Sequence, residues 1–151
     1  RFQRLLWQEG AVGLDGVVIE ALRLIGFEVF DRDPAQLEVR LGGSGAFIEI
    51  EGSEHAIDMA AHHRLRQRIE RAIERRGEAP RGVLFANGQR LLPPMERTHV
   101  TDAVRVASET MRYCVAPTSG LYDAVAAQLR GDDDAVAAYR QRLMVTDGLL
   151  S

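Results

Sequence analysis

The sequence predicts an α/β domain in which a mixed β-sheet is flanked by helices. Its 151 residues suffice for one ordinary domain, spanning 1–151, with one hydrophobic core. Apolar residues make up 46% and charged residues 27%, which fits a folded globular chain and excludes a disordered tail or a membrane protein. Segments with helical periodicity alternate with short segments of strand character, and their order predicts an antiparallel meander followed by crossover strands.

The first half of the chain is expected to form a helix and then the meander. Apolar residues recur at steps of three and four between Leu14 and Ile25, and Gly26 follows where a helix commonly ends. An Asp-Pro turn and a glycine-rich hairpin then separate three short runs in which alternate residues are apolar. The strands of the meander are expected at residues 27–30, 36–41 and 46–51.

The second half alternates helices with short apolar strands, which is typical of crossover connections. A long helix over about 58–76 carries a core stripe that includes Leu65 and Ile69. Asn87-Gly88 and Pro93-Pro94 mark the loop that follows the next strand. Further strands are expected at 82–86 and 113–116, and further helices at about 101–111, 119–129 and 133–145.

Charge and cysteine content exclude several classes of protein. All 19 basic residues are arginine, so a phosphate-binding P-loop lysine, a Schiff-base lysine and a lysine general base are all excluded. The net charge of -3 argues against nonspecific coating of DNA, although a local basic face is compatible with it. Cys114 is the only cysteine, which excludes an intrachain disulfide and indicates a reducing compartment.

Targeting signals and membrane spans are not expected. No apolar run approaches the roughly 20 residues that span a bilayer, and no basic start precedes a hydrophobic run, so we expect a cytoplasmic protein without membrane partners. The chain begins at Arg1 inside an expected helix. This start is compatible with a fragment of a longer protein, in which other domains would be partners.

Three acidic residues, with the order of the elements, give the sequence a resemblance to a known family. Asp15 lies on the first helix, and Glu49 and Glu51 end the third strand of the meander. With this element order, nearly the whole chain resembles the PD-(D/E)xK nuclease superfamily, which has the restriction endonuclease-like fold. The resemblance implies an acid on the helix, an aspartate at the start of the second strand, and Glu-x-Lys on the third. Glu49 and Asp15 match, whereas Gln36 replaces the aspartate and Glu51 replaces the lysine.

These replacements predict a catalytically degenerate site. Nucleases of this superfamily hold Mg²⁺ with carboxylates, and the amide of Gln36 is a poorer ligand than an anion. Glu51 adds negative charge where a lysine would offset phosphate charge. We therefore expect a module for nucleic-acid or nucleotide binding, sensing or assembly that requires no cofactor.

Two alternatives remain open. In an active nuclease, Mg²⁺ or Mn²⁺ would be held by Glu49 and Glu51 together with either Asp15 or Glu38. Glu38 lies on the same strand face as Gln36 and about 7 Å further along. In a purely structural domain, the apolar start of the chain and the two closing helices would mediate protein interaction or homodimerisation. The residues that suggest this second alternative are Phe2, Leu5, Leu6 and Trp7.

Arginines form the other candidate site. Arg64, Arg68, Arg71 and Arg75 advance by three or four residues along the long helix and therefore form one stripe. We predict that Arg64 and Arg68, together with Arg90 on a strand-end loop, bind a phosphate-bearing ligand. The alternative for this stripe is a solvated, charged helix face.

Overall fold

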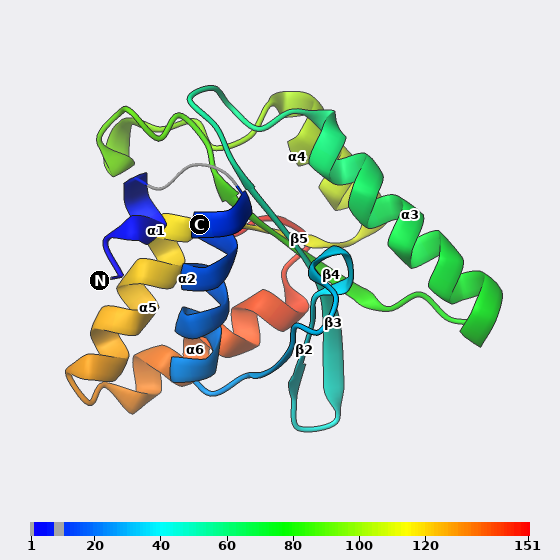
Figure 1. Ribbon diagram of the computed structural model, residues 1–151, viewed down its shortest axis with the longest axis horizontal. Helices are drawn as coiled ribbons and strands as arrows, with labels where there is room; N and C mark the ends of the chain where they lie inside the picture. The colour runs from blue at the N-terminus through cyan, green and yellow to red at the C-terminus, as the bar shows by residue number, and fades with distance from the viewer. Residues whose placement is uncertain (1, 8–10) are drawn as a thin grey trace.

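The computed structural model describes residues 2–7 and 11–151, which form a sheet covered by helices on both faces (Figure 1). The strands are β1 (Glu28–Phe30), β2 (Glu38–Leu41), β3 (Ser44–Gly52), β4 (Arg81–Asn87), β5 (Cys114–Pro117) and β6 (Gly148–Leu149). The α-helices are α1 (Arg4–Trp7), α2 (Ala11–Leu24), α3 (Met59–Arg76), α4 (Asp102–Met111), α5 (Thr118–Leu129) and α6 (Asp133–Val145). Two 3-10 helices are η1 (Pro34–Gln36) and η2 (Pro94–Glu96).

The six strands lie in the sheet in chain order. The β1–β2 and β2–β3 pairs are antiparallel, and the β3–β4, β4–β5 and β5–β6 pairs are parallel. Helices make the crossover connections between the parallel strands. The predicted α/β class, with a meander followed by crossover strands, is therefore confirmed.

The sheet divides the expected core into two layers. Helices α1, α2, α5 and α6 cover one face, and α3 and α4 cover the other (Figure 1). Successive residues of β4 point to opposite layers: Val83 and Phe85 face the first, whereas Leu84 and Ala86 face the second. These four residues are almost completely buried, as expected for a central strand with both faces covered.

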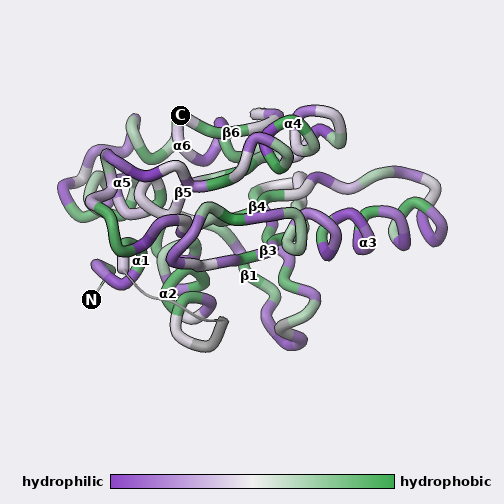
Figure 2. Tube along the Cα trace, turned by 90° about the horizontal axis from the view of Figure 1, so that it is seen from above, coloured by the Kyte–Doolittle hydropathy of each residue, from purple (hydrophilic) through white to green (hydrophobic). Residues whose placement is uncertain are grey.

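Helix α3 has defined ends and one buried stripe. The Asp58 carboxylate accepts a hydrogen bond from the Ala60 amide, and Gly77, in the left-handed conformation, ends the helix. The C-terminal part of the helix extends away from the sheet in both views (Figures 1 and 2). The stripe that holds α3 on the sheet consists of Ala61, Leu65, Ile69 and Ala72.

Two strands differ from the expectation. The strand expected at 36–41 begins only at Glu38, because the Asp33-Pro34 turn continues into η1. Asp33 caps this turn by accepting hydrogen bonds from the Ala35 amide at its carboxylate and from the Gln36 amide at its carbonyl. Gln36 is therefore a turn residue rather than the first residue of β2. Strand β6 was not expected, since two residues are too few to show alternation.

The start of the chain packs only partly. Leu5 of α1 is fully buried, but the Trp7 side chain is about half exposed and lies under the Arg97 guanidinium, whose carbon is 5.0 Å from the ring centroid. Arg1 lies outside the described residues. No helix among the described residues is both long and apolar enough to cross a membrane.

Candidate functional site

The carboxyl end of β3 presents two acids on one face of the sheet. Ile48 and Ile50 pack into the layer of α2 and α5, so the side chains between and after them point toward α3. Those side chains are Glu49 and Glu51, as the alternation predicts. Strand β2 does not extend this far, since its first residue, Glu38, pairs with Phe47. The end of β3 is therefore open on its β2 side.

Arg64 of α3 bridges these two acids. Its Nε lies 3.0 Å from Glu49 Oε1, and its Nη2 lies 2.5 Å from Glu51 Oε2. Burial disfavours the charged guanidinium, but the hydrogen bonds with Glu51 and Glu49 outweigh this effect, and the pKa of Arg64 is raised. One guanidinium thus forms ion pairs with both glutamates of the predicted degenerate site.

Arg68, one turn further along α3, closes the open edge of the sheet. Its Nη1 donates to the Ile48 carbonyl at 2.7 Å and to Glu49 Oε2 at 3.0 Å, while Nη2 donates to the Leu37 carbonyl at 2.6 Å. The guanidinium carbon lies 4.7 Å from the centroid of the Phe47 ring. The Arg68 side chain is only 11% exposed, so this predicted ligand-binding residue is engaged by the fold itself.

Asp15 reaches the same place from α2. Together with Glu49, Glu51, Arg64 and Arg68 it lines a cavity of about 530 Å³. Its Oδ1 is buried and has no hydrogen-bond partner in the part of the chain that the structure describes. Burial raises the pKa of Asp15, and repulsion by Glu49 and Glu51 raises it further, while Arg64 opposes the shift.

The donor set does not suit a divalent cation as it stands. No three acidic, histidine or cysteine side chains of residues 2–7 and 11–151 converge as metal ligands. Both oxygens of Glu49 are bonded to arginines, and Glu38, the third ligand expected for an active nuclease, lines a different hollow. The arrangement neutralises the carboxylates with guanidinium groups rather than collecting them around one point.

That second hollow, of about 180 Å³, lies beside the first, and Arg68 borders both. Gln36 and Glu38 line it from the meander. Glu49 and Glu51 do not, so the four meander positions 36, 38, 49 and 51 do not share one cleft. Four arginines of α3 also line this hollow: Arg68, Arg71, Arg75 and Arg76. Its lining side chains therefore carry an excess of positive charge.

Arg90, the third predicted ligand-binding arginine, lies outside both hollows. It follows β4 on a loop, where its Nη2 is 3.0 Å from Glu54 Oε1 and its amide donates to the Ser53 carbonyl. These contacts tie the β4–α4 loop to the β3–α3 loop. The structure thus brings Arg64 and Arg68 to the acids, whereas Arg90 lines neither hollow.

Histidine contributes to structure rather than to this site. His62 is buried, and its Nδ1 lies 2.8 Å from the hydroxyl oxygen of Tyr113. Burial lowers the pKa of His62, and the positive neighbours His63 and Arg66 lower it further.

The comparisons with known proteins add no further information. No protein-family model matches the chain, and searches of curated proteins and of solved structures found no significant match.

Proposed function

We propose that this domain is a catalytically degenerate relative of the PD-(D/E)xK nucleases and that it binds nucleic acid without cleaving it. The observation that carries the proposal is that the arginines of α3 fall into two groups, one paired with acids and one exposed. Arg64 and Arg68 neutralise Glu49 and Glu51, whereas Arg71 and Arg75 project from the exposed side. The order of a meander followed by a parallel crossover strand supports the resemblance.

The charge of the second hollow favours a polyanion. Within residues 2–7 and 11–151, neither Arg71 nor Arg75 has an acidic partner within ion-pair distance. Arg71 and Arg75 are four residues apart, which corresponds to about 6 Å along a helix. Two guanidinium groups at this spacing suit two successive phosphates of one strand.

The occupied carboxylates argue against cleavage. Metal-dependent hydrolysis needs carboxylate oxygens that are open to a cation, and here each glutamate already accepts from a guanidinium. Breaking a partly buried ion pair such as Glu49–Arg68 leaves an uncompensated charge. We therefore expect binding to persist in the absence of divalent metal.

A salt titration tests this function. Fluorescence anisotropy with labelled single- and double-stranded DNA, repeated over a range of salt, gives the dependence of affinity on ionic strength. The double variant Arg71→Gln/Arg75→Gln should lower the slope of log K against log salt by about 2, since each phosphate contact contributes about 0.9. The matched control, Arg105→Gln/Arg130→Gln, loses the same charge on α4 and at the end of α5. An equal loss in both double variants, or no binding by the parent protein, would refute the proposal.

An active Mg²⁺- or Mn²⁺-dependent nuclease is the second candidate, and Asp15 is the observation that favours it. Its carboxylate is partly buried, lacks a partner at Oδ1 within the described residues, and borders the cavity of Glu49 and Glu51. Incubating the same DNA with each metal separates the two functions. Robust cleavage that Glu49→Ala abolishes would establish the nuclease, whereas the degenerate site predicts none with either metal.

A further inference from the structure

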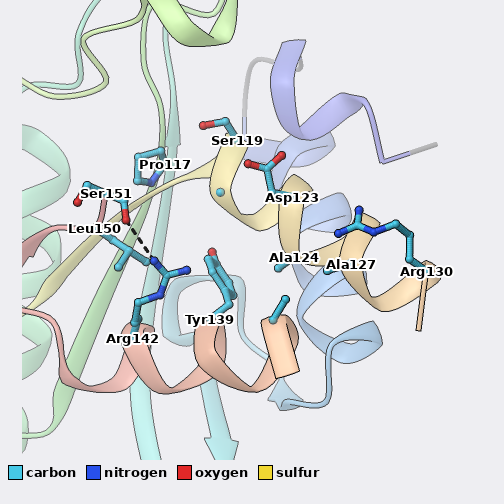
Figure 3. Close-up of a pocket in the computed structure, with 12 residues that line it drawn as sticks. Pro117, Ser119, Asp123, Ala124, Ala127, Arg130, Tyr139, Arg142, Leu150 and Ser151 are labelled. Atoms are coloured by element: carbon cyan, nitrogen blue, oxygen red, sulfur yellow. Dashed lines mark hydrogen bonds between the residues drawn. The ribbon is translucent and has the colours of Figure 1, made fainter. Parts of the chain in front are cut away.

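A second site lies across the sheet from the arginines of α3, between α5 and α6. It is a groove of about 530 Å³ and is the subject of Figure 3. The groove exists because α5 presents Gly120, Ala124 and Ala127 to α6, where Ala135 faces them. These small side chains leave space that larger ones would fill. Neither the resemblance nor the proposed function uses this space.

Tyr139 of α6 supplies an unused hydrogen-bonding group in this groove. The residue is only 4% exposed, and its hydroxyl oxygen is buried without a hydrogen-bond partner among the described residues. Figure 3 shows the hydroxyl directed into the groove, between Ala124 and Leu150. A buried polar group without a partner costs free energy, so such groups usually have a partner. A bound molecule would provide one.

One end of the groove brings the start of helix α5 close to an arginine of α6. Helix α5 begins at Thr118, and its N-cap residue, Pro117, provides no side-chain hydrogen bond. The first amides of a helix lack intrahelical acceptors and carry the positive end of the helix dipole. Ser119 and Gly120 of this first turn line the groove, and Arg142 reaches the same end from α6. The guanidinium Nη1 of Arg142 is 3.3 Å from the Ser151 carbonyl, a long contact at an exposed position.

Two further charged groups border the groove. Asp123 lies one turn along α5, and Arg130 lies beyond the helix end, 4.0 Å from Asp132. The Arg130 side chain is exposed and separated from the first turn of α5 by the length of the helix. The positive end formed by Arg142 is therefore the better site for an anion, and the Asp123 carboxylate suits a hydroxyl or amino group of the same molecule.

We infer that the groove binds a small organic molecule through an oxyanion group, a phosphate or a carboxylate, held by the first turn of α5, Arg142 and the Tyr139 hydroxyl. The donors come from two helices and from backbone and side chains, as in the anion sites at helix N-termini. The site is independent of the proposed nucleic-acid surface because no residue lines both.

Isothermal titration calorimetry on the full chain tests this inference with two probes, inorganic phosphate and acetate. At least one should bind in about the millimolar range, since such small ligands make few contacts, and the probe that binds identifies the oxyanion. Arg142→Gln should weaken binding by about 10-fold or more, because a hydrogen bond to a charged group is lost. Tyr139→Phe should weaken it by about 2- to 10-fold.

Three control variants make the result specific. Tyr122→Phe makes the same chemical change on a tyrosine of α5 that does not line the groove, and Arg105→Gln removes an arginine of α4. Arg71→Gln/Arg75→Gln removes the proposed nucleic-acid contacts. All three should bind the probe as the parent does. Binding of neither probe, or equal weakening by Arg105→Gln and Arg142→Gln, would overturn the inference.

Thermal stability without any probe gives a second, independent readout. Because the Tyr139 hydroxyl has no protein partner in the described chain, Tyr139→Phe should leave the melting temperature of the unliganded protein unchanged or raise it. A marked drop would mean that the hydroxyl has a structural partner, and the inference would then be wrong.

Discussion

Replacing Arg68 by methionine removes the group that closes the open edge between β2 and β3. The substitution leaves the carbonyls of Leu37 and Ile48 without this donor and leaves Glu49, whose side chain is 12% exposed, without its buried partner. Methionine keeps most of the side-chain length, so packing against Phe47 is partly preserved. The variant therefore tests mainly the loss of the guanidinium hydrogen bonds and charge.

The expected loss is large relative to the stability of a domain. Breaking a buried ion pair by removing one partner costs about 3 to 5 kcal/mol. Arg68 is nearly buried and donates three hydrogen bonds, so we expect a decrease of about this size in the free energy of unfolding. For a chain of this length, that decrease corresponds to a melting temperature about 6 to 20 °C lower.

Urea denaturation of Arg68→Met and Arg75→Met measures this loss against a matched control. Arg75 lies on the exposed side of the same helix, so its substitution should change stability by about 0.5 kcal/mol or less. Glu49→Gln in the Arg68→Met background should recover part of the loss, because Arg64 alone would otherwise pair with both Glu49 and Glu51. A loss below about 1 kcal/mol in Arg68→Met would show that Arg68 is a surface residue and refute this account of the sheet edge.

Three further predictions concern single positions. Burial, and then repulsion by neighbouring acids, raises the pKa of Asp15, so the stability of the folded protein should fall as the pH rises from 3.8 through the raised value. Asp15→Asn removes this effect and should therefore raise the melting temperature at pH 7. The difference between the variant and the parent should disappear toward pH 3.8. A methyl carbon on Gly88 would lie 2.0 Å from the His99 carbonyl oxygen, so Gly88→Ala should lower the free energy of unfolding by about 3 kcal/mol or more in the same denaturation assay. A methyl carbon on Gly43 would meet open space, so Gly43→Ala should have little effect. Burial raises the pKa of the Cys114 thiol to about 12, so a maleimide should label the folded protein only at the rate of unfolding; rapid labelling at neutral pH would show that the thiol is accessible.

Local patterns in the sequence predicted most of the elements. The long helix was expected at about 58–76 and occupies Met59–Arg76, because its apolar stripe, its Asp58 cap and Gly77 all act within a few residues. Strand β6 was not predicted, because Gly148 and Leu149 form a strand only by pairing with β5 in the tertiary fold. The start of β2 was predicted at Gln36, two residues too early, because the Asp33 cap holds Gln36 in a turn.

The sequence predicted which residues form the site, but not that the arginines of α3 contact the glutamates of β3. The spacing of Arg64 and Arg68 predicted a stripe on α3, and strand alternation placed Glu49 and Glu51 together. That the stripe faces those acids depends on how Leu65 and Ile69 rotate the helix against the sheet, which only packing decides. The groove beside Tyr139 gave no signal, because Gly120 and Ala124 look the same in sequence whether helices touch or leave a space between them.

The exclusive use of arginine has a structural consequence at this sheet edge. A guanidinium presents several N–H donors in a planar fork, whereas a lysine ammonium is a compact point charge. The Arg64 guanidinium donates to two carboxylates of one strand, those of Glu49 and Glu51. The Arg68 guanidinium donates to the carbonyls of Leu37 and Ile48, which belong to different segments, and also to the Glu49 carboxylate. A single ammonium at either position would satisfy fewer of these acceptors. Arg64 and Arg68, which the sequence predicts as ligand contacts, are thus bonded within the fold. In the nucleic-acid-binding function proposed above, the phosphate contacts are therefore assigned to Arg71 and Arg75, whose side chains make no such internal bridges among the described residues.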